Sequence, residues 1–75
     1  MIYPHFRVTT VTHEGLVSVD DFESGDNENR ALRTFNKARY ETPGTLFVVV
    51  LKRSERGAEW SPVPGVAYTW SGAGR

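Results

Sequence analysis

Histidines are the first residues to consider for chemistry, because a pair of them could share a metal ion. His5 and His13 are the only histidines in the chain. They lie near opposite ends of a predicted strand, which would separate them by roughly 25 Å. One ion cannot bind both side chains, so the sequence predicts no histidine metal site.

The acidic segment that begins at Asp20 offers carboxylates of the kind that calcium binds. A calcium loop starting at Asp20 would place Gly25 where such loops need a glycine. Phe22 and Ala31 would then stand at two positions that require oxygen ligands, and neither side chain has an oxygen. We therefore interpret the segment as a solvated loop that leads into a helix, with no metal bound.

Motifs for covalent or nucleotide chemistry are equally scarce. The chain has no Cys, no G-x-S-x-G turn, no Walker loop and no dinucleotide-binding glycine pattern. A chain of 75 residues also has little volume for a cleft that excludes solvent. The sequence thus predicts a protein that is not an enzyme and that needs no cofactor.

Size and charge limit the remaining classes of function. The 75 residues predict a single domain (1–75), with 1–4 as a lead-in and 71–75 as a flexible tail. Nine basic residues balance nine acidic ones, whereas general polyanion binders are strongly basic. No apolar run reaches the length of a membrane span, and no signal peptide is visible. These features predict a soluble, cytoplasmic protein with a cysteine-free core.

The longest apolar run, from Leu46 to Leu51, predicts the central strand of the fold. It lies within the stretch from Thr45 to Arg53 and contains three β-branched residues but no Gly or Pro. Such a run favours a strand that is buried on both faces.

A hairpin is predicted to precede this strand. Residues 5–12 are rich in Thr, Val and Phe in partial alternation. Residues 16–22 form the returning strand, with Val17 and Val19 on one face. Glu14 and Gly15 supply the turn, since glycine accepts a positive φ without strain.

One helix is predicted, from about Asn27 to Tyr40 or Glu41. Its apolar residues form a narrow stripe that includes two alanines, so the helix can lie close to a sheet. The Thr-Pro-Gly sequence of residues 42–44 ends it, because proline disfavours helical geometry in the preceding residue. The stripe consists of Ala31, Leu32, Phe35 and Ala38.

Prolines interrupt the C-terminal part of the chain. Residues 54–57 predict a turn, 58–61 an additional short strand, and 66–70 the last strand. Pro62 and Pro64 cannot donate ladder hydrogen bonds, so this region belongs at a sheet edge or in a loop. The order β-β-α-β-(β)-β predicts an α+β fold, a small antiparallel or mixed sheet of about four to five strands with one helix packed on one face.

Protein recognition is the function that these exclusions favour. The charge is segregated, acidic from Asp20 to Glu28 and basic from Arg30 to Arg39, which can orient a partner. Trp and Tyr, which are enriched at interface hot spots, are concentrated late in the chain. An edge strand could also accept a strand of the partner. The predicted partner-binding residues are Trp60, Tyr68, Trp70, Asp20, Asp21, Glu23 and Asp26.

In general style the chain is similar to many small accessory proteins of phages and mobile elements. That likeness implies a stoichiometric modulator or inhibitor of a larger protein complex. Two alternatives stay open: a nucleic-acid-binding protein, and a homo-oligomeric structural protein in which a second copy covers an open sheet face. The nucleic-acid alternative would use Arg30, Arg33, Lys37, Lys52 and Arg53.

Overall fold

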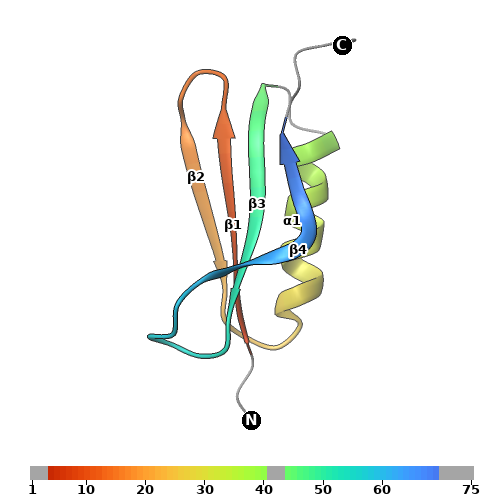
Figure 1. Cartoon of the computed structure of the whole chain (residues 1–75). Helices are drawn as coiled ribbons and strands as arrows, with labels where there is room; N and C mark the ends of the chain where they lie inside the picture. Colours follow the sequence, from red (N-terminus) through yellow and green to blue (C-terminus); the bar gives the residue numbers. More distant parts are fainter. Residues whose placement is uncertain (1–3, 41–43, 70–75) are drawn as a thin grey trace.

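In the part of the chain that the structure describes, four strands and one helix follow one another (Figure 1). The computed structural model describes residues 4–40 and 44–69. The predicted hairpin, helix and central strand are confirmed, with bounds that agree to within a residue. The elements are β1 (His5–Thr12), β2 (Val17–Phe22), α1 (Asn27–Tyr40), β3 (Thr45–Arg53) and β4 (Ser61–Thr69).

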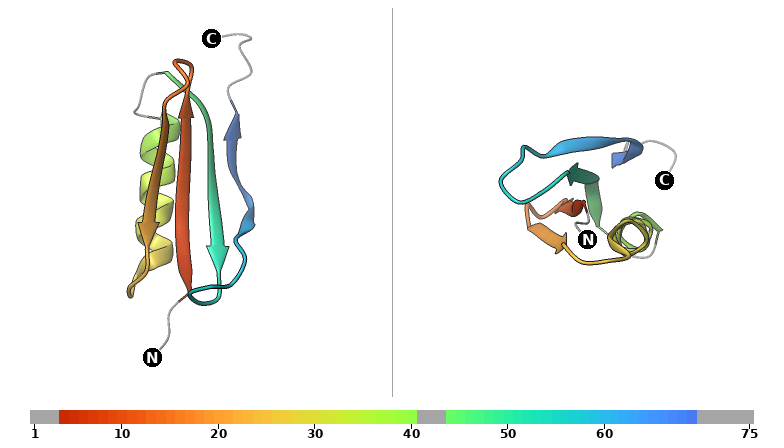
Figure 2. Two further views of the ribbon diagram at one scale, coloured as in Figure 1. Left: turned by 90° about the vertical axis from the view of Figure 1, so that its left-hand side faces the viewer. Right: turned by 90° about the horizontal axis from the view of Figure 1, so that it is seen from below.

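The strands form one sheet in the order β2-β1-β3-β4, and each neighbouring pair is antiparallel. The helix α1 connects the edge strand β2 to the inner strand β3 and lies along one side of the sheet (Figures 1 and 2). The α+β class is therefore as predicted, with an antiparallel rather than a mixed sheet and four strands rather than five.

The core lies between α1 and the two inner strands. Val8, Val48 and Val50 are the largest fully buried side chains, with exposed fractions of 0–1%. Full burial of a valine stabilises the fold by about 1.5–3 kcal/mol. Ala31 and Ala38 of the helix stripe are buried in the same cluster as these valines. The complete core is Phe6, Val8, Ala31, Phe35, Ala38, Val48 and Val50, with Phe22, Val63, Val66 and Tyr68 packed against it.

The start of α1 is held by two residues of the acidic loop. The carbonyl of Asp26 accepts a hydrogen bond from the amide of Arg30 at 3.1 Å, and its carboxylate accepts one from Asn29 at 2.7 Å. Asn27 is buried and donates a hydrogen bond from its side chain to the carbonyl of Pro4. These contacts fix where the helix begins and tie it to the lead-in of β1.

One prediction about β3 is wrong, because the strand is fully buried on a single face. Val48 and Val50 face α1 and are buried, whereas Phe47, Val49 and Leu51 face the other way and stay half-buried. One helix can cover only one side of a sheet, and neighbouring side chains shield the opposite side only in part.

The C-terminal strand also differs from the prediction. Residues 58–60 form no strand, and β4 is a single strand that includes both Pro62 and Pro64. The strand tolerates them because it lies at the sheet edge, as the prolines predicted. Its register against β3 shifts in the region of Gly65, whose φ is 77°. Trp70, which was expected to end the last strand, lies outside the described residues.

Candidate functional site

Side chains on the side of the sheet away from α1 form a surface that we call the helix-free face. Strand alternation and register arrange them in rows that run from β2 to β4. The first row holds Val17, Val11, Phe47 and Thr69, the second Val19, Thr9, Val49 and Ala67, and the third Asp21, Arg7, Leu51 and Pro62.

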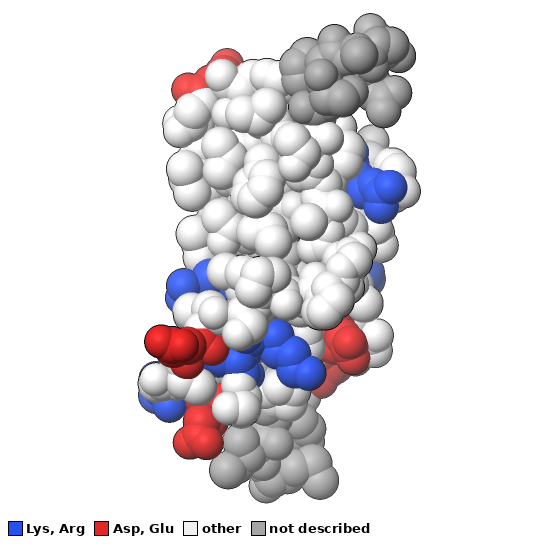
Figure 3. Space-filling view, viewed as in Figure 1, with Lys and Arg blue, Asp and Glu red and all other residues white. Residues whose placement is uncertain are grey.

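The first two rows of the helix-free face carry no charged side chain. Figure 3 views this face and shows a broad uncharged area, with the charged groups gathered towards the lower end. Val17 is 62% exposed and Val19 is 52% exposed, although both are large apolar residues in a regular strand. Contiguous exposed apolar surface of this kind is typical of interaction sites.

Charged side chains and one tryptophan gather at the lower end of the face, and we call them the Trp60 cluster. They come from the start of β1, the end of β2, the end of β3 and the segment that leads to β4. Segments far apart in the sequence meet here because β1, β2 and β3 pair in register. The Trp60 cluster consists of His5, Arg7, Asp21, Glu23, Arg53, Arg56 and Trp60.

Trp60 contacts two guanidinium groups. The Cζ of Arg7 lies 4.5 Å from the centroid of its ring system, and the Cζ of Arg53 lies 4.4 Å from it. Arginine stacks well on an indole face, and each such contact contributes about 0.5–1 kcal/mol at an exposed site. These contacts attach the segment before β4 to the end of the sheet.

Glu23 contacts both Arg53 and Arg56, and His5 contacts Arg53. The carboxylate of Glu23 contacts Arg53 at 3.4 Å and Arg56 at 3.2 Å. Arg53 also donates a hydrogen bond from Nε to Nδ1 of His5 at 3.0 Å. His5 accepts at Nδ1 in this contact. The side chain of His5 is 9% exposed and acts as a buried structural acceptor.

Arg7 of β1 and Asp21 of β2 form a bidentate ion pair. Arg7 donates from Nε to one carboxylate oxygen at 2.7 Å and from a terminal nitrogen to the other at 3.1 Å. The hydrogen bond lowers the pKa of Asp21 below its ordinary value of 3.8, against a smaller opposing effect of desolvation. The same bond raises the pKa of Arg7. The pair orients the Arg7 guanidinium under Trp60.

The structure brings three of the predicted partner-binding residues together. Trp60, Asp21 and Glu23 all belong to the Trp60 cluster. Tyr68 pairs with Val48 and packs against the core on the helix side. The remaining predicted residues are placed apart: Asp20 on the helix side of β2, Asp26 at the start of α1, and Trp70 outside the described residues.

The five cations of the nucleic-acid alternative do not share one surface. Arg53 lies on the helix-free side, where its side chain is 15% exposed and bound to Glu23. Lys52 lies on the opposite side of the sheet, over the ring of Phe6. The helix residues are engaged locally, since Arg33 pairs with Asp26 and Arg30 lies over a phenylalanine ring. Lys37 lies on α1 beside a shallow hollow against β1 and β2.

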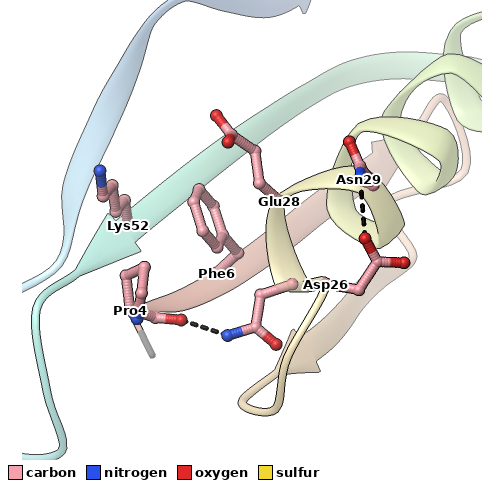
Figure 4. A pocket seen from close by; sticks show the side chains of 7 residues that line it. Pro4, Phe6, Asp26, Glu28, Asn29 and Lys52 are labelled. Atoms are coloured by element: carbon pink, nitrogen blue, oxygen red, sulfur yellow. Dashed lines mark hydrogen bonds between the residues drawn. The ribbon is translucent and has the colours of Figure 1, made fainter. Parts of the chain in front are cut away.

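A separate hollow of about 280 Å³ lies at the start of α1. Figure 4 shows Phe6 within it, flanked by Lys52, Glu28 and Asp26. Asn27 also lines it, and Oδ1 of that side chain has no partner among the described residues. The hollow is open and carries charges of both signs, which suits ordered water better than a single class of ligand.

Sequence reasoning missed the roles of His5 and Arg7 and the exposure of Val17 and Val19. The alternation in residues 16–22 did place the two valines on one face, but alternation alone cannot show which face a helix covers. His5 was weighed only as a metal ligand. Its actual partner, Arg53, is 48 residues away and is brought close by the pairing of β1 with β3.

Within residues 4–40 and 44–69, no three side chains of the metal-binding types His, Cys, Asp and Glu are grouped so that they could hold an ion. No helix of that same part of the chain is long and apolar enough to cross a membrane. Comparison of the chain with known protein families, with curated proteins and with solved structures gives no match.

Proposed function

We propose that the protein is a non-enzymatic interaction module that binds another protein stoichiometrically through its helix-free face. The observation that carries this proposal is the exposure of apolar side chains in regular strands, within the two rows of the helix-free face that carry no charge. Val17 and Val19 are more than half exposed, and the inner-strand residues beside them are only half-buried.

The energetics favour an apolar partner surface at the centre of this face. Each square ångström of apolar surface removed from water contributes about 25 cal/mol. The rows through Val11 and Thr9 contain no charged group whose desolvation would oppose docking. A partner that covers them gains hydrophobic free energy without having to supply an opposite charge there.

The Trp60 cluster supplies the polar rim of the proposed interface. Interfaces combine an apolar centre with a polar edge, and Trp and Arg are the residues most enriched among hot spots. Trp60 is held in place by Arg7 and Arg53, so docking costs it little conformational entropy. Arg56 contacts Glu23, but its side chain is 82% exposed, so it can also reach an acidic group of the partner.

The test is capture of a partner from the native host, followed by titration of the purified pair. Ala67→Asp tests the helix-free face. Ala67 is exposed there, so the substitution introduces a charge without disturbing the core. Asn36→Asp is the matched control, since it adds the same charge to the exposed side of α1.

We expect the native chain and Asn36→Asp to bind one partner with equal affinity and integral stoichiometry. Ala67→Asp should weaken binding at least tenfold, because an unpaired charge would be desolvated. Equal binding by both variants, or retention of nucleic acid alone with a steep salt dependence, would overturn the proposal.

A further inference from the structure

The outer edge of β2 presents backbone groups whose direction follows from the hairpin. The amide of Thr12 donates to the carbonyl of Leu16 at 3.0 Å, in line with the register that pairs Val11 with Val17. Hydrogen-bonded and non-bonded pairs alternate along an antiparallel ladder. Val17, Val19 and Asp21 therefore occupy non-bonded positions against β1, and their N–H and C=O groups point away from the sheet.

This edge lacks proline, lysine and bulges, three of the features that prevent strand addition, and its two charged residues are Asp20 and Asp21. Residues 17–22 contain no Pro and no Lys, and their register against β1 is continuous. The opposite edge is different, because β4 contains Pro62, Pro64 and a register shift. Proline and bulges block addition at β4, so the sheet can extend on one side only.

We infer that a second copy of the chain adds to this edge, with β2 antiparallel to β2 of the partner about a two-fold axis at Val19. Val19 then pairs with its symmetry mate, and Val17 pairs with Asp21 of the second copy. All three outward-facing residues find partners, which gives about six backbone hydrogen bonds. The inference concerns the β2 edge and does not depend on the partner proposed above for the helix-free face.

Side-chain chemistry supports this register. Ser18 comes to lie opposite Asp20 of the second copy on the helix side, where the hydroxyl can donate to the carboxylate. Asp21 carries its own compensating charge, because Arg7 of the same chain already neutralises it. If the register shifted by one residue, backbone N–H and C=O groups that point outward on one strand would face residues of the other strand whose groups point towards β1. If it shifted by two residues, backbone hydrogen bonds at the strand ends would be lost.

The dimer would also join two helix-free faces side by side. The uncharged rows of one chain span about 19 Å across the strands and about 10–17 Å along them. One face therefore offers about 190–320 Å² and two joined faces about 380–650 Å², which is closer to the roughly 800 Å² per partner of a standard interface. Because the β4 edge is blocked, the assembly closes as a dimer and does not continue into a fibre.

Disulfide trapping tests the pairing directly, since the chain has no cysteine of its own. Val19→Cys places two thiols across the axis at a Cα separation of about 5.5 Å, within disulfide range. Val17→Cys is the matched control, because it is as exposed on the same strand but lies about 14 Å from its mate. We expect Val19→Cys to form a covalent dimer rapidly and Val17→Cys to do so many times more slowly. Equal rates would overturn the inference.

Val19→Pro tests the pairing without a new thiol. The amide of Val19 points away from β1, so proline removes no hydrogen bond within the chain but blocks the added strand. Light scattering should give twice the chain mass for the native protein and for Ala67→Asp, and a single chain mass for Val19→Pro with an unchanged circular dichroism spectrum. A native protein that is monomeric at high concentration would overturn the inference even if partner capture succeeds. A dimeric native protein that captures no partner would overturn only the proposed function.

Discussion

Val48 and Val49 are adjacent in β3 and lie on opposite sides of the sheet in different environments. Val48 is completely buried under α1, whereas Val49 is half-buried on the helix-free face. Val48→Asp should therefore prevent folding, because an unpaired buried charge costs an amount comparable to the about 5–15 kcal/mol that stabilises a small domain. Val49→Asp should leave a folded chain that is moderately less stable. Circular dichroism and urea unfolding of both variants check this.

Comparing Val48→Asp with Val49→Asp also shows whether another surface covers β3 on the helix-free face. If Val49→Asp unfolds the chain as completely as Val48→Asp does, the helix-free face is covered in solution. Measuring the Val49 variant across a range of protein concentrations separates cover by a second copy from cover within the chain, because only the former depends on concentration.

The Arg7–Asp21 ion pair should make stability depend on pH in the acid range. The folded pKa of Asp21 lies below its ordinary value of 3.8, so the native state binds fewer protons than the unfolded state there. Its contribution is present above that value and disappears as the pH falls through the lowered pKa. Asp21→Asn should cost up to about 1 kcal/mol at neutral pH, since the pair is partly exposed.

Urea unfolding from neutral pH down to acid pH checks the prediction about Asp21. The curves of the native chain and Asp21→Asn should converge as the pH falls. Glu55→Gln, a change at an exposed carboxylate in the loop after β3, should shift the curve much less. A gap between native chain and Asp21→Asn that stays constant with pH would contradict the assigned cause.

Trp60 should stabilise the loop between β3 and β4 through its two arginines. Trp60→Ala removes both stacking contacts and some apolar burial, so we expect a loss of about 1–3 kcal/mol. Trp60→Phe keeps an aromatic face over the guanidinium groups and should lose less than half as much. Urea unfolding gives the stabilities, and limited proteolysis should show faster cleavage in residues 54–60 of the alanine variant.

Gly65 should stabilise the positive-φ conformation that β4 adopts directly after Pro62 and Pro64. Its φ of 77° is strained for residues with a Cβ, although no atom of the described residues, apart from its chain neighbours, lies within 4 Å of an added Cβ. Gly65→Ala should therefore destabilise the protein by about 1 kcal/mol through backbone strain alone. Gly65→Asn should cost less, because asparagine tolerates this conformation better. Thermal unfolding of the two variants checks the order, and a reversed order would point to a side-chain contact instead.

Local sequence patterns were sufficient to predict most elements of this fold. The alternation in residues 5–12 and 16–22, the stripe at Ala31, Phe35 and Ala38, and the apolar run in β3 each reflect a periodicity that a short segment expresses by itself. The same is true of the prolines that assign the C-terminal segment to an edge. These signals are local, so they need no knowledge of the partner strand.

The candidate site depends on pairings between distant segments, which no local pattern contains. Arg7 meets Asp21 across 14 positions and Arg53 meets His5 across 48. Both contacts exist because the register of β1 against β2 and β3 places these residues side by side. Likewise, Val17 and Val19 could face a core or solvent, and the position of α1 on the opposite side of the sheet leaves them exposed. Composition and periodicity thus specify the elements, whereas register and layer order assign each side chain to the core or to the surface.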